Sequence, residues 1–185
     1  MRRASHAACA FVLAAIVPLA GCEWLKAQAP GALGVRNAQL VAAGGGARLD
    51  LALDCRLSGP MQDALDHGIP VTLVVDVRGG DWPHRLHATQ NVELRYFPLS
   101  RRYQLREGES GEVRSFATRN WLVAALGSLR LPLPPAFAQL PAGANLRVRA
   151  GIDATALPGS LRLPALFEPA WRLASADTTW PVAAH

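Results

Sequence analysis

Apolar and polar residues alternate with a period of two along much of the chain. Residues 48–57 are the clearest case, because five side chains at every second position are apolar and the charged ones lie between them: Leu49, Leu51, Leu53, Cys55 and Leu57. Such alternation predicts a strand with one buried and one solvent-exposed face. The same pattern predicts strands at 35–41, 71–78, 92–97, 102–106, 113–116 and 146–153, with two shorter ones at 161–163 and 171–173.

Two segments have helical spacing instead. Residues 60–67 begin with a proline at the first helical position and are followed by Gly68. Residues 119–129 follow a capping residue, Thr118, and repeat apolar side chains on one helical face. We expect polar loops at 79–90 and after Pro132. Eight or nine short strands with two short helices predict a mainly β protein, an antiparallel β-sandwich or open barrel with the helices at an end or edge.

The first 21 residues differ from the rest, because a basic start precedes an almost wholly apolar stretch. Residues 7–20 are shorter than a membrane-spanning helix, and Leu19–Ala20–Gly21–Cys22, which spans the end of this stretch, has the form of a bacterial lipobox. This predicts a lipoprotein signal peptide at 1–21 and attachment of acyl chains, palmitate among them, to the Cys22 thiol. An ordinary secretory signal cleaved after Ala27–Gln28–Ala29 and an uncleaved anchor are the alternatives.

Cleavage before Cys22 defines the expected organisation of the mature chain. A tether at 22–34 would join the lipid to a single β-rich domain at 35–181. The chain would face the periplasm of a Gram-negative bacterium from the outer membrane, because Glu23 is not the aspartate that retains lipoproteins in the inner membrane. Loss of Arg2 and Arg3 lowers the formal charge of +5 by two. Cys55 would be the one unmodified cysteine, and its place among the apolar positions favours an unreactive structural thiol.

Several segments together resemble the domain of unknown function family 4390, whose members are exported proteobacterial proteins. They are DALDHGIP at 63–70, LRYFPLSRRY at 94–103, SF at 115–116, ID at 152–153, LPGSLR at 157–162, WRLAS at 171–175 and WP at 180–181. The resemblance extends over about residues 35–181. It implies export to the periplasm and no established catalytic residues. It also implies a place near envelope sensing, because genes of the family often lie beside a two-component histidine kinase.

Cationic and aromatic residues gather around one predicted hairpin. The arginines are Arg95, Arg101, Arg102, Arg106 and Arg114, and the aromatic residues are Tyr96, Phe97 and Tyr103. Guanidinium groups beside aromatic rings suit anionic lipid, lipopolysaccharide or the acidic patch of a protein. A merely solvated strand face is the alternative, and nucleic acid is not an expected partner in this compartment.

Candidate catalytic chemistry is sparse. His84 and His87 are weak metal candidates, because zinc takes three or four ligands and no further cysteine or histidine lies close in sequence. We expect no catalytic residue, no metal and no cofactor. The hypothesis is a non-catalytic envelope lipoprotein with a partner- or ligand-binding β-sandwich, accessory to a two-component sensor kinase. The alternatives are a structural envelope scaffold and, in third place, an enzyme that uses the loop with His84 and His87.

Overall fold

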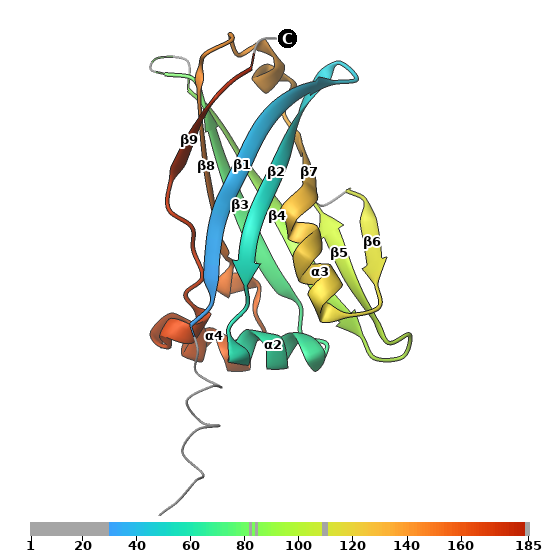
Figure 1. Ribbon diagram of the computed structural model, residues 1–185. Helices are drawn as coiled ribbons and strands as arrows, with labels where there is room; N and C mark the ends of the chain where they lie inside the picture. The colour runs from blue at the N-terminus through green and yellow to red at the C-terminus, as the bar shows by residue number, and fades with distance from the viewer. Residues whose placement is uncertain (1–29, 82, 84, 109–110, 184–185) are drawn as a thin grey trace, which may run out of the picture.

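Two antiparallel sheets pack face to face in the computed structural model, which describes residues 30–81, 83, 85–108 and 111–183 (Figure 1). The smaller sheet has the order β1-β2-β7 and the larger the order β6-β5-β4-β3-β8-β9. The strands are β1 (Ala32–Ala43), β2 (Gly46–Arg56), β3 (Val71–Gly79), β4 (Leu86–Phe97), β5 (Arg102–Glu107), β6 (Val113–Phe116), β7 (Leu129–Leu133), β8 (Asn145–Ile152) and β9 (Thr178–Pro181). The predicted mainly β, antiparallel sandwich is confirmed, and the sheets do not close into a barrel.

The core lies between the sheets, where the alternating apolar positions meet. In β2 and β3 every second side chain is buried, from Leu49 to Leu53 and from Val71 to Val77. Side chains of β8 complete the layer in the same way, with Leu146, Val148 and Ala150 at no more than 1% exposure. Each buried Leu or Val contributes about 1.5–3 kcal/mol relative to an exposed one, so this alternation is the main source of stability.

Helices cover one end of the sandwich. There, α2 (Gly59–Asp66), α4 (Gly159–Phe167) and the short 3-10 helices Ala154–Ala156 and Pro169–Trp171 lie beside the start of β1 (Figure 1). Ser58 caps α2 by accepting a bond from the Met61 amide, and Gly68 follows the helix with φ at 81°. A further α-helix, α3 (Arg119–Ala125), packs beside β5 and β6. Within the described ranges, no helix combines the length and hydropathy that crossing a bilayer requires.

Two of the predicted strands are wrong. Residues 161–163 belong to α4, where Leu161 and Ala165 lie one turn apart and pack toward the core. The alternation of Leu161 and Leu163 was misleading because apolar side chains lie on more than one face of this helix. Trp171 ends the 3-10 helix Pro169–Trp171, and between this helix and β9 the structure has a single bridge, from Ala174 to Gly151.

Four boundaries also differ from prediction. The helix expected at 119–129 ends at Ala125, and the 3-10 turn Leu126–Ser128 leads into β7. Strand β7 includes Pro132, where the sequence predicted the start of a loop. Proline is tolerated in β7 and in β9 because both are edge strands. The 3-10 helix Pro135–Gln139 follows β7. The expected polar loop at 79–90 is shorter, because β4 already begins at Leu86, and β1 begins three residues earlier than predicted, at Ala32.

Candidate functional site: a basic sheet face

The predicted cluster of arginines and tyrosines is divided between two faces of the β4–β5 hairpin. Arg95, Arg102 and Arg106 are exposed on the outer face of the large sheet. Tyr96 and Tyr103 are directly opposite each other on the inner face, with ring centroids 4.6 Å apart. The predicted residues therefore do not form one surface, because neighbouring strand positions point to opposite sides. Arg101 is exposed in the turn between the strands.

The tyrosine side of the hairpin is tied to the helices. The Tyr103 hydroxyl donates to Asp66 Oδ1 at 2.8 Å, and the other carboxylate oxygen of Asp66 pairs with Arg119 of α3. Burial and then the hydrogen bond to Asp66 raise the pKa of Tyr103 to about 12. These contacts join α2, α3 and β5.

Arg114 of the predicted cluster is also structural. Its guanidinium lies 2.5 Å from Glu107 Oε1 and donates to the carbonyl oxygens of Ala125 and Ser128 at 3.2 and 3.3 Å. Glu107 is only 4% exposed and also accepts a bond of 2.6 Å from the Arg130 amide. The ion pair thus lies within the β5–β6 hairpin, and the bond from the Arg130 amide to Glu107 connects it to β7 of the other sheet.

The outer face of the large sheet brings together more arginines than the hairpin alone. Strands β3, β4, β5 and β8 place six there: Arg78, Arg95, Arg102, Arg106, Arg147 and Arg149. Pairing puts Arg78 opposite both His87 and Arg147, with Asp76 opposite Arg149. Sequence reasoning missed the contribution of β3 and β8, although the alternation at 71–78 and 146–153 already assigns their arginines to the exposed face.

Carboxylates neutralise only part of this charge. Asp76 pairs with Arg78 at 2.9 Å and with His87 at 2.7 Å, and Glu93 lies 3.8 Å from Arg106. These are the two acidic side chains of the four strands on this face. Arg95 stacks over the Phe97 ring at 5.0 Å. In the part of the chain that the structure describes, no ion pair holds Arg102, Arg147 or Arg149. We name this surface, the outer face of β3, β4, β5 and β8, the basic sheet face.

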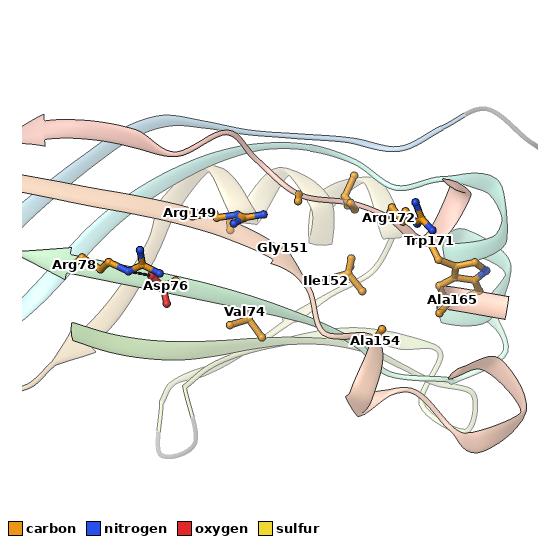
Figure 2. A pocket seen from close by; sticks show the side chains of 13 residues that line it. Val74, Asp76, Arg78, Arg149, Gly151, Ile152, Ala154, Ala165, Trp171 and Arg172 are labelled. Atoms are coloured by element: carbon orange, nitrogen blue, oxygen red, sulfur yellow. Dashed lines mark ion pairs between the residues drawn. The ribbon is translucent and has the colours of Figure 1, made fainter. Parts of the chain in front are cut away.

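A groove of about 410 Å³ hollows the basic sheet face where β3 and β8 approach residues 171–174. Figure 2 shows the Asp76–Arg78 pair on one side, Arg149 beside Gly151, and Arg172 with Trp171 on the other side. Side chains of Val74 and Ile152 add apolar lining. An open groove with three guanidinium groups and one carboxylate can accept an acidic side chain, since guanidinium binds carboxylate in bidentate fashion.

The remaining predicted residues are two cysteines and two histidines. Cys22 and His84 lie outside the described residues. His87 lies on β4 with Asp76 as its contact, and within the described residues no group of three or more His, Cys, Asp or Glu side chains could hold a metal ion. Burial, assisted by the charge of Asp54, raises the pKa of the Cys55 thiol to about 12. A thiol protonated at neutral pH is a poor nucleophile, in keeping with the structural role predicted for it.

The family comparison coincides with the bounds of the sandwich. The model of the domain of unknown function DUF4390 matches residues 32–181, from the first residue of β1 to the last of β9. The resemblance expected from the sequence is confirmed. No curated protein and no solved structure matches the chain.

Proposed function

This chain belongs to the DUF4390 family, and from that premise we propose that it is a non-catalytic lipoprotein of the cell envelope whose basic sheet face binds an acidic surface of a partner protein. The observation that carries the proposal is the charge of that face. Six arginines lie across four adjacent strands with two carboxylates among them.

The form of the face favours a macromolecular partner. The arginines are spread over β3, β4, β5 and β8, and the groove between Arg149 and Arg172 is open to solvent. A broad field of one sign attracts an oppositely charged surface and speeds association. The groove then supplies one point at which an acidic side chain of the partner can be enclosed.

The membrane attachment in this proposal rests on Leu19–Ala20–Gly21–Cys22. Acyl chains on Cys22 would hold the basic sheet face close to the membrane, facing the periplasm. The extracytoplasmic part of a two-component sensor kinase is the first candidate partner, because the family resemblance implies a role near envelope sensing. A structural scaffold would use the same face for several abundant envelope proteins.

Crosslinking of the tagged full-length chain in its native envelope tests the binding role. We expect one acidic partner to be enriched over an unrelated lipoprotein, and to fall at least about tenfold with Arg147→Glu and Arg149→Glu. The matched control is Arg56→Glu with Arg130→Glu, which changes the net charge equally on exposed positions of the smaller sheet. Equal loss in both variants, or no enriched partner, would contradict a specific role for the basic sheet face.

Substitution of Cys22→Ser in the full-length chain tests the anchor. We expect loss of metabolic labelling by radioactive palmitate and release of the chain from the membrane fraction. Continued membrane retention without the lipid label would show that another segment holds the protein at the membrane.

A further inference from the structure

Exposed apolar side chains gather at the end of the sandwich where the described chain enters β1. Six large apolar residues are exposed in the described part of the chain, and four of them belong to this end: Leu99, Leu163, Leu166 and Phe167. Leu99 lies in the turn after β4, beside Pro98, which approaches Gly68 after α2. The other two, Val113 and Trp121, lie on β6 and α3.

Helix α4 carries most of this apolar surface. Its Leu161 and Ala165 pack toward the core, whereas Leu163, Leu166 and Phe167 remain 66%, 55% and 75% exposed. These three positions are spaced by three and four residues, so they form one stripe along the helix. A soluble surface rarely leaves such a stripe uncovered, which indicates a contact with an apolar phase or partner.

Basic side chains border the stripe. Arg162 donates to the Leu157 carbonyl at 2.8 Å, and Arg172 donates to the carbonyl of Leu166 at 2.9 Å. Both are exposed, and Glu168 is the one acidic residue between 159 and 172. Arg101 accompanies Leu99 in the turn after β4, and Arg102 follows as the first residue of β5. Apolar side chains bordered by arginine are typical of helices that lie in the interface of an anionic membrane.

The proposed lipid on Cys22 is close in sequence to the same end of the sandwich. Gly31 lies against Leu173, a residue that follows α4 in the sequence. Helix α4 lies beside the start of β1 (Figure 1). Eight peptide units separate Cys22 from Pro30, and at about 3.5 Å for each they span at most about 28 Å. A lipid on Cys22 would therefore keep α4 within reach of the bilayer surface.

We propose that the stripe of α4, with Leu99 as a second contact, lies on the surface of the lipid bilayer that holds the anchor. This inference rests on the proposed lipid attachment at Cys22. The strands run away from this end of the molecule (Figure 1). The sandwich would accordingly stand upright, with the basic sheet face turned sideways toward the extracytoplasmic part of a neighbouring membrane protein.

Photolabelling of the lipid-modified full-length protein tests the inference. The protein is reconstituted in vesicles of phosphatidylethanolamine and phosphatidylglycerol that contain a photoactivatable phospholipid, and labelled residues are located by mass spectrometry. We expect label in residues 159–167 and at Leu99, and little on β6. The variant Leu166→Gln with Phe167→Gln should lower the label on α4 at least about fivefold, whereas Val113→Gln, an exposed control on β6, should not.

The two proposals fail in different ways in this experiment. Label on α4 no greater than on β6 overturns the inference, and the mass of the peptide that contains Cys22 independently reports whether lipid is attached. If Cys22 carries no lipid, the anchor is wrong, and the label on α4 still decides whether the helix contacts the bilayer. Far-ultraviolet circular dichroism checks that the variants keep the native fold, as expected for exposed side chains.

Discussion

Similar residues have different roles on the two faces of the β4–β5 hairpin. On the inner face, Tyr103 bonds to Asp66 and the neighbouring Arg114 pairs with a nearly buried Glu107. On the outer face, Arg102 is exposed with no ion pair in the described part of the chain, and Arg106 lies 3.8 Å from Glu93. Arginine is thus a structural residue on one side of the hairpin and a candidate binding residue on the other.

The difference follows from desolvation. A charged group that leaves water loses its hydration, so on the inner face each one must have a protein partner with good geometry. On the outer face water solvates the guanidinium groups, and they can remain without partners until another molecule supplies carboxylates. The comparison predicts that substitutions on the inner face lower stability, whereas those on the outer face weaken binding.

The largest effect is expected from Arg114→Ala. It leaves the Glu107 carboxylate buried without its counter-charge, and such a loss lowers the free energy of unfolding by about 3 kcal/mol. Urea denaturation followed by circular dichroism measures it, with Arg102→Ala as the matched control on the outer face. Equal stability of the two variants would contradict the division between the faces.

A smaller loss is expected from Tyr103→Phe, which removes only the hydroxyl that bonds to Asp66. Loss of one hydrogen bond to a carboxylate that keeps its partner Arg119 lowers the free energy of unfolding by about 1 kcal/mol. Tyr96→Phe is the control, because no hydrogen bond of its hydroxyl occurs among the described residues. A loss as large in the Tyr96 variant would show that packing of the two rings, not the bond to Asp66, is responsible.

The same tyrosine predicts a pH dependence. Its pKa is raised to about 12 from the ordinary tyrosine value of 10.0, so folding favours the protonated phenol. That contribution is complete below pH 10 and is lost as the pH rises from 10 toward 12. Stability of the wild-type protein should fall more steeply in this window than that of Tyr103→Phe, measured by the urea midpoint at each pH. Parallel profiles for the two proteins would contradict this.

The smallest change in stability is expected from Arg102→Ala, within about 0.5 kcal/mol, because an exposed side chain without an ion pair adds little to the fold. The same substitution should weaken capture of the acidic partner, and more strongly at low salt, where charge attraction is less screened. Surface plasmon resonance with the captured partner at two salt concentrations measures this. Unchanged affinity at both salt concentrations would show that Arg102 does not contribute to partner binding at the basic sheet face.

The candidate site shows what a local pattern can and cannot predict. Alternation correctly assigned Arg95, Arg147 and Arg149 to exposed strand positions. It could not show that β3 and β8 join the hairpin in one sheet, since that order is set by contacts between residues far apart in the sequence. The cluster predicted around the hairpin therefore contained the tyrosines of the wrong face and lacked the arginines of β3 and β8.

The sequence by itself determined the class of fold and the family. A period of two in apolar residues can bury its face only against another sheet or a helix, so a mainly β protein follows from the pattern, whereas the tertiary structure decided between a sandwich and an open barrel. Only the tertiary structure decided the edge strands and the helix at 159–167. Prolines in β7 and β9 obscure the strand signal and are acceptable only because those strands lie at edges. In α4, apolar residues occur on two sides, and the packing of Leu161 and Ala165 against the core determines which side remains exposed.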